Sequence, residues 1–149
     1  MGCLAGFPAG PAAFRDNRGP EMISHVTVGS DDIDRAKAFY KKVMAPLSYA
    51  RVFEGDDYFA YGETEASPPC FWVLPPFDGR PAERGNGWHC AFLAPSRAAV
   101  DAFHAAALES GGSDEGAPGL RPQYTENYYG AYARDPDGNK LQAVCTHTE

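Results

Sequence analysis

The sequence predicts an α+β fold of two tandem βαβββ modules, whose strands form a cupped mixed sheet around a central cleft. Strand-like and helix-like segments follow the same order in both halves of the chain. The halves also align without gaps at first, because His25 falls on His89 and Phe39 on Phe103, an offset of 64 residues in each case (89 − 25 and 103 − 39). Such internal repetition indicates a repeated supersecondary unit. One unit alone would leave a sheet face exposed, so pairing two units, within one chain or between chains, creates a concave interior.

Composition favours a globular protein that binds a small molecule. The 149 residues are 44% hydrophobic and 22% charged, the balance of an ordinary soluble domain. The net charge of −7 gives no general attraction to nucleic acid or to an anionic membrane. No apolar stretch is long enough to cross a membrane, and no apolar signal-peptide core is evident, so we expect a cytoplasmic protein.

The first half begins with residues 1–21, which are rich in Gly, Ala and Pro and are predicted to form a flexible extension. The patterned domain is predicted over residues 22–149, and Met22 is a possible natural start. The first module, residues 22–76, has a strand at 23–29, a helix from about Asp32 to Val43, and strands at 49–53, 58–62 and 70–74. A linker dense in Pro and Gly follows at 75–86.

The second module, residues 86–147, repeats this pattern. It has a strand at 88–93 and a helix at 97–109, which Gly111 is well placed to end. Leu108 is predicted to face inward from this helix, whereas His104 and His147 are predicted to lie at the surface. A short strand is expected at 120–124. The cysteines that lie in apolar strands are expected to be buried reduced thiols; these are Cys70, Cys90 and Cys145.

Residues 128–147 are predicted to form a β-hairpin closed by the turn sequence Asp-Pro-Asp-Gly-Asn at 135–139. In its second strand, alternation places Leu141, Ala143 and Cys145 on one face and Gln142 on the other. A polar residue in mid-strand needs partners if its face is buried. These partners are protein groups, a ligand or a metal.

Three stretches together resemble the vicinal oxygen chelate superfamily, which includes glyoxalase I, extradiol dioxygenases and bleomycin-resistance proteins. They are His25-Val26-Thr27-Val28-Gly29 with the helix after it, Gly87-Trp88-His89-Cys90-Ala91-Phe92, and residues 128–139. The resemblance covers about Met22 to His147. It implies two βαβββ modules around a central pocket and, by analogy with other members, a homodimer.

The resemblance also implies a metal site with two ligands from each module. Its positions fall on His25, His89 and Gln142, whereas the fourth falls at about Trp72, which cannot ligate a metal. Two imidazoles suit Zn, Fe, Ni, Mn or Co and leave positions open for water or substrate. The alternative is that both histidines are hydrogen-bonded core residues. No carboxylate is evident as a general base, so no catalytic residue is assigned.

Substrate contacts are expected from Arg121, Tyr124, Tyr128, Tyr129 and Trp72, because a guanidinium can hold an anion and aromatic side chains can stack on a ring. Packing and surface ion pairing are the alternative roles for these side chains. Two functions follow from the resemblance. One is a metal-assisted lyase, isomerase or oxygenase acting on a small molecule with vicinal oxygens. The other is a metal-free binding protein of the bleomycin-resistance type. A structural or regulatory dimer with an unused cleft is a third possibility.

Overall fold

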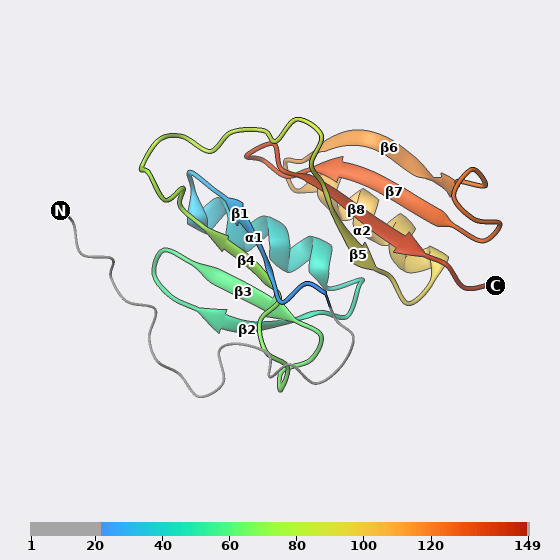
Figure 1. The fold of residues 1–149 in the computed structure, drawn as a ribbon, viewed down its shortest axis with the longest axis horizontal. Helices are drawn as coiled ribbons and strands as arrows, with labels where there is room; N and C mark the ends of the chain where they lie inside the picture. The colour runs from blue at the N-terminus through green and yellow to red at the C-terminus, as the bar shows by residue number, and fades with distance from the viewer. Residues whose placement is uncertain (1–21, 149) are drawn as a thin grey trace.

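The computed structural model of the protein describes residues 22–148. The extension expected at residues 1–21 lies outside this range, as does Cys3. In the described part, ten elements follow the predicted order βαβββ–βαβββ, and the α+β fold of two tandem modules is confirmed (Figure 1). No helix in residues 22–148 has the length and apolar character that spanning a bilayer requires.

The first module is a four-stranded mixed sheet with one helix. Its strands lie in the order β1-β4-β3-β2; β1 and β4 are parallel and the other neighbours are antiparallel. Its elements are β1 (Val26–Gly29), α1 (Ile33–Met44), β2 (Ala50–Glu54), β3 (Phe59–Gly62) and β4 (Phe71–Leu74). Asp32 caps α1, because its side chain accepts a hydrogen bond of 2.9 Å from the backbone nitrogen of Arg35.

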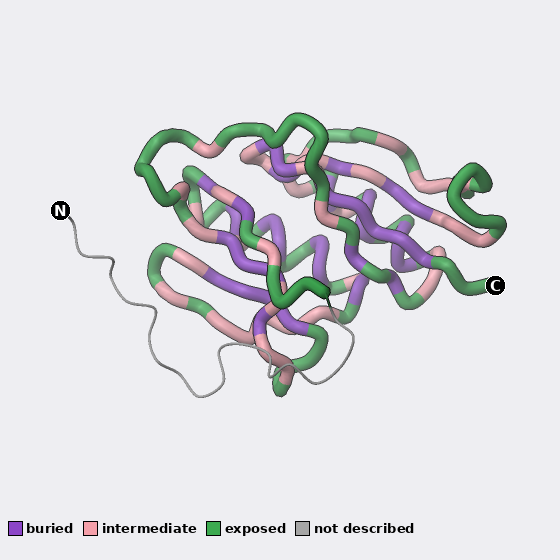
Figure 2. Tube along the Cα trace, in the orientation of Figure 1, coloured by how far each residue is buried: buried purple, intermediate pink, exposed green. Residues whose placement is uncertain are grey.

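The second module repeats this topology, with strand order β5-β8-β7-β6 and a parallel pair formed by β5 and β8. Its elements are β5 (Cys90–Leu93), α2 (Arg97–Glu109), β6 (Ser113–Leu120), β7 (Tyr129–Arg134) and β8 (Lys140–Cys145). The mixed sheet of the prediction is therefore two four-stranded sheets, one in each module. The exposed linker between β4 and β5 joins them along one side of the molecule (Figure 2).

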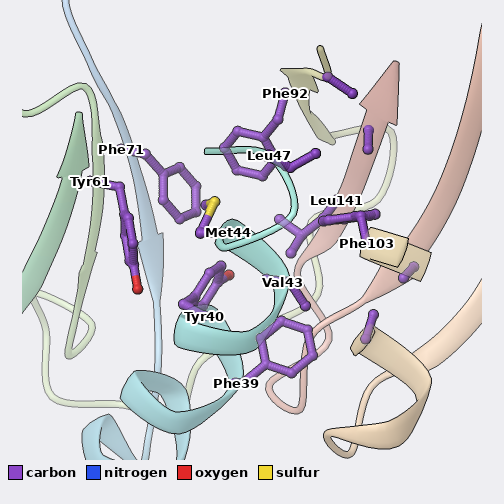
Figure 3. Close-up of a cluster of buried hydrophobic side chains, with 14 of the residues drawn as sticks. Phe39, Tyr40, Val43, Met44, Leu47, Tyr61, Phe71, Phe92, Phe103 and Leu141 are labelled. Carbon is purple, nitrogen blue, oxygen red and sulfur yellow. The ribbon is translucent and has the colours of Figure 1, made fainter. Parts of the chain in front are cut away.

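The hydrophobic core is continuous between the two modules. Helix α1 contacts both its own sheet and α2, so its apolar side chains lie between the two halves (Figure 3). Phe71 of β4 meets Phe92 of β5 edge to face, with ring centres 5.0 Å apart. Tyr40 of α1 packs on Phe71 at 5.3 Å. Rings in contact across the junction make the modules one packing unit.

The turn at residues 135–139, which we call the inter-module turn, docks on the first module. Asp137 accepts hydrogen bonds from Ser30 Oγ at 2.7 Å and from the backbone nitrogen of Asp31 at 3.0 Å. Asn139 Nδ2 donates to the carbonyl oxygen of Gly29 at 2.9 Å, which joins the end of β1 to the start of β8. The turn therefore fixes the first module against the second.

Asp135 holds the inter-module turn together from within the interface. Its carboxylate accepts hydrogen bonds from Tyr40 Oη at 2.7 Å and from Asn139 Nδ2 at 2.8 Å. Burial raises the pKa of Asp135, although these hydrogen bonds act in the opposite direction. Burial also raises the pKa of Tyr40, and the neighbouring Asp135 adds to the effect.

Three sequence predictions were wrong. The short strand expected at 120–124 is a strand that ends at Leu120, after which the chain turns at Arg121 and Pro122. His104 is buried rather than at the surface, because its Nε2 lies 2.8 Å from Asp114 Oδ1 on β6. Leu108 is 43% exposed and does not face the core.

Candidate functional site

The candidate site lies on the face of the second sheet opposite the face that α2 covers. Gln142 of β8 is paired with Ala91 of β5 on one side and with Tyr132 of β7 on the other. His89 precedes Ala91 by two residues, so strand alternation places it on the face of Gln142. Its ring meets Tyr132 edge to face, with centres 5.8 Å apart. The structure therefore brings together His89 and Gln142, with Tyr132 beside both.

Gln142 has a fixed amide. The side chain is only 1% exposed, and its Nε2 donates a hydrogen bond of 2.7 Å to Tyr128 Oη. This bond commits the amide nitrogen and leaves Oε1 as the atom that can accept a hydrogen bond or ligate a metal. Leu141, Ala143 and Cys145, the alternate residues of the strand, belong to the hydrophobic core, as the predicted alternation requires.

Three tyrosines lie near Gln142 and His89: Tyr124, Tyr128 and Tyr132. We call this side of the second sheet the tyrosine face. The rings of Tyr124 and Tyr128 are 5.0 Å apart. Burial raises the pKa of Tyr132 to about 12, and a hydrogen bond with Tyr124 adds to the increase. Lys140 Nζ lies 5.1 Å from the centre of the Tyr132 ring. The Tyr132 hydroxyl therefore stays neutral near pH 7 and serves as a hydrogen-bonding group.

The sequence prediction missed Tyr132 and included Tyr129. Strand alternation distinguishes these two tyrosines, because the side chains of Tyr128 and Tyr132 lie on one face of the hairpin and that of Tyr129 lies on the opposite face. In the structure Tyr129 faces α2, where its hydroxyl donates to Asp101 Oδ1 at 2.8 Å. Arg97 of α2 lies over the same ring, 5.4 Å from its centre.

Arg121 is beside the tyrosines but is held by the backbone of its own loop. Its Nη2 donates to the carbonyl oxygen of Ala117 at 2.7 Å, and its Nη1 donates to that of Leu120 at 3.3 Å. Its positive charge lowers the pKa of Tyr132, against the larger effect of burial. The guanidinium is thus positioned at the edge of the tyrosine group.

His25 and Trp72 lie on the first sheet rather than on the tyrosine face. Trp72 pairs with Thr27 in the first sheet, and Gln142 pairs with Ala91 in the second. Because Thr27 and Ala91 correspond at the 64-residue offset, Trp72 and Gln142 occupy equivalent positions in the two modules. Its ring centre is 5.6 Å from that of Phe53 and 6.4 Å from that of Tyr58, within an aromatic cluster of the first module. His25 is exposed just before β1, and its Nδ1 lies 2.8 Å from Ser24 Oγ.

The donor set available to a metal is small. Within residues 22–148, no three side chains of the types His, Cys, Asp and Glu are grouped so that they could hold a metal ion. A metal on the tyrosine face would therefore use the amide oxygen of Gln142 with the imidazole of His89. Glu63 and Glu126 are exposed and lie in loops rather than on this face.

Known proteins of one superfamily match this chain. The family model described as Glyoxalase/Bleomycin resistance protein/Dioxygenase superfamily matches residues 22–143. The metallothiol transferase FosB of Shouchella clausii is 33% identical over 125 residues, which are 80% of this chain and 77% of that protein.

Solved structures agree with this match. A glyoxalase/bleomycin resistance protein from Albidiferax ferrireducens is 38% identical, with a TM-score of 0.75 over 84% of this chain and 99% of that one. A glyoxalase I mutant from Zea mays has the same fold at 23% identity, with a TM-score of 0.63 over 82% of this chain and 46% of that one. The chain belongs to the glyoxalase/bleomycin resistance protein/dioxygenase superfamily.

Proposed function

We propose that the protein is a metal-assisted enzyme that acts on a small molecule with vicinal oxygen atoms. His89 and Gln142 hold the divalent ion, which is Zn, Fe, Ni, Mn or Co, and the superfamily resemblance implies His25 of the first module as a third ligand. The observation that carries the proposal is the orientation of Gln142. Its amide nitrogen is committed to Tyr128, so that Oε1 is presented on the face that His89 shares.

The proposed ligands are chemically suited to a divalent ion but would bind it weakly. Imidazole nitrogen and amide oxygen are both acceptable ligands, but none of the three brings a negative charge to offset the dication. The hydrogen bond from Gln142 to Tyr128 orients a ligand in the way that a neighbouring group commonly does in metal sites. When bound, the ion would polarise the two neighbouring oxygens of the substrate.

The protein's own residues then bind and orient the substrate. Tyr124, Tyr128 and Tyr132 supply aromatic rings and hydroxyls near Gln142, and Lys140 and Arg121 supply positive charge nearby. Such a face suits a small anionic substrate. The resemblance supports lyase, isomerase or oxygenase chemistry, and the similarity to the metallothiol transferase FosB supports metal dependence and thiol transfer.

Metal analysis tests the proposal. The protein is purified without a metal-chelating tag, loaded with each ion in turn, and analysed for bound metal. We expect stoichiometric metal in the wild type, a loss in His25→Ala and in His89→Ala, and no change in His147→Ala, which alters an exposed histidine. Gln142→Glu should bind the ion more tightly, because a carboxylate adds the missing negative charge. Absence of metal under every loading condition would contradict the proposal.

A metal-free binding protein is the second candidate, and the aromatic cluster around Trp72 favours it. Trp72 occupies the position equivalent to Gln142, and Phe53 and Tyr58 extend the apolar surface there. This candidate requires a ligand that raises the melting temperature equally with and without a chelator. If the protein is instead a metal-assisted enzyme, the chelator should abolish the ligand-dependent rise in melting temperature.

We also propose a homodimer, as the superfamily resemblance implies. Sedimentation equilibrium of the full chain measures its mass directly. A mass of one chain at every concentration would contradict the dimer but would leave the metal proposal intact.

A further inference from the structure

The orientation of the Gln142 side chain matters because an amide has two unlike ends. Its oxygen can accept a hydrogen bond or ligate a cation, whereas its nitrogen carries two donor hydrogens and can do neither. The two ends have nearly the same shape, so an unrestrained amide can turn over and present its nitrogen instead. A carboxylate has two equivalent oxygens and needs no such restraint. A glutamine that ligates a metal therefore needs neighbours that fix which end faces the ion.

Tyr128 fixes the nitrogen end of this amide. Its hydroxyl accepts the hydrogen bond of 2.7 Å from Gln142 Nε2, and the glutamine side chain is buried. The backbone of Tyr128 is held on both sides, because its nitrogen donates to the carbonyl oxygen of Thr125 at 3.1 Å and its carbonyl oxygen accepts from the nitrogen of Arg121 at 2.7 Å. Its ring packs on that of Tyr124. The hydroxyl is thus held in place by contacts that do not involve Gln142.

Gly130 provides the space in which the amide lies. It is between Tyr128 and Tyr132 on the same face of the hairpin, and it pairs with Val144 of β8. A Cβ atom at Gly130 would lie 3.1 Å from Gln142 Nε2 and 3.3 Å from the nearest atom of the Tyr128 ring. The φ of Gly130 is not positive, so its backbone conformation does not require glycine. The room that the amide needs is the reason for glycine at this position.

We infer that Tyr128 and Gly130 are the positioning residues of Gln142, which lock its amide so that Oε1 is left for the ion. The inference rests on the proposed function, because it takes Gln142 as a metal ligand. Both residues act on the ion only through the amide. The Tyr128 hydroxyl is therefore needed while residue 142 is a glutamine and is dispensable in Gln142→Glu.

Hydrogen exchange of the side-chain amides, measured by NMR, tests the lock without any metal. The chain has two glutamines, the buried Gln142 and the exposed Gln123, so labelling the glutamine side-chain nitrogens provides an internal reference. We expect the amide protons of Gln142 to exchange more slowly than those of Gln123. Tyr128→Phe and Gly130→Ala should each accelerate exchange at Gln142 by about tenfold, the scale of one lost hydrogen bond, and leave Gln123 unchanged.

Tyr129→Phe is the matched control. It removes a hydroxyl from the adjacent residue, on the opposite face of the hairpin, where the partner is Asp101. Exchange at Gln142 should be unchanged in this variant. Melting temperatures establish that every variant folds, and Tyr128→Phe keeps the ring that packs on Tyr124. Equal exchange at Gln142 in the wild type and in Tyr128→Phe would overturn the inference, as would an equal acceleration in Tyr129→Phe.

Titration calorimetry with Ni²⁺ measures the consequence for the ion. Tyr128→Phe should weaken Ni²⁺ binding by about tenfold, the lower end of the loss seen when a metal ligand loses its hydrogen-bond partner. In the Gln142→Glu background, the same change should weaken binding by less than about threefold, because either carboxylate oxygen can ligate. Equal losses in the two backgrounds would overturn the inference, because Tyr128 would then act through the fold rather than through the amide.

The two measurements separate this inference from the proposed function. If neither the wild type nor Gln142→Glu binds Ni²⁺ or another candidate ion, the metal site is contradicted, and the exchange rates still decide whether Tyr128 and Gly130 hold the amide. If Tyr128→Phe binds Ni²⁺ as tightly as the wild type does, the inference fails and the metal proposal stands.

Discussion

Asp137 connects two distant parts of the chain through a single carboxylate. Its side chain is 1% exposed and contacts Ser30 Oγ, the backbone nitrogen of Asp31 and, at 2.9 Å, the guanidinium of Arg35. The carboxylate lies at the start of α1, where a negative charge interacts favourably with the helix dipole. One residue of the second module thereby completes the amino-terminal end of a helix in the first.

Replacing Asp137 with Ala should destabilise the protein by about 2–3 kcal/mol, because a buried donor loses its partner and charged hydrogen bonds are lost. Urea denaturation followed by circular dichroism measures the change. Asp78→Ala is the control, since it removes an exposed aspartate paired with Arg80 and should have little effect. Equal losses in the two variants would show that the inter-module turn does not hold the modules together.

Helix α2 ends in a tight junction with β6. Gly111 has a φ of +91°, which favours glycine and confirms its predicted role in ending the helix. Gly112 is constrained for a different reason. A Cβ atom there would lie 2.5 Å from the carbonyl oxygen of Arg134 and 2.7 Å from that of Ala107. Both are backbone atoms, which cannot move aside as a flexible side chain can.

Gly112→Ala should therefore lower the free energy of unfolding by about 1–3 kcal/mol, the usual cost of forcing an extra carbon into a packed site. The matched control is Gly119→Ala on β6, where the nearby atom is the end of the flexible Arg121 side chain. We expect that control to stay within about 0.5 kcal/mol of the wild type. A smaller effect at Gly112 than at Gly119 would mean that the junction relaxes easily.

At the scale of the whole molecule, the two modules share one core and one docked turn. The Phe71–Phe92 contact and the hydrogen bonds of the inter-module turn join them at separate places. Neither module therefore buries its apolar surface fully without the other. A small domain of this kind unfolds in a single cooperative step.

The two tryptophans allow a direct test of this cooperativity, because Trp72 lies in the first module and Trp88 directly precedes β5 of the second. Variants Trp88→Phe and Trp72→Phe each leave one reporter. In each variant, we expect the urea midpoint from fluorescence to coincide with that from far-UV circular dichroism. Separate midpoints would show that the modules unfold independently.

The two modules could be predicted because both the apolar periodicity of each element and the 64-residue repeat are visible in the sequence itself. Strand β6 was missed because Ser113–Leu120 contains glycine, proline and charged residues. It is a strand only through its pairing with β7, at the edge of the sheet, where such residues are tolerated. Tyr132 was missed although alternation would have found it. The contact between Phe71 and Phe92 depends on how the modules pack, which no local pattern encodes.

The inter-module turn also has a consequence for the synthesis of the protein. A ribosome makes the chain from its amino terminus, so Asp137 and Asn139 are made 107 and 110 residues after Ser30 and Gly29, on which they dock. Until then, Tyr40 lacks the carboxylate that its hydroxyl meets in the finished protein. During synthesis, the first module therefore lacks these hydrogen-bond partners until the inter-module turn has been translated.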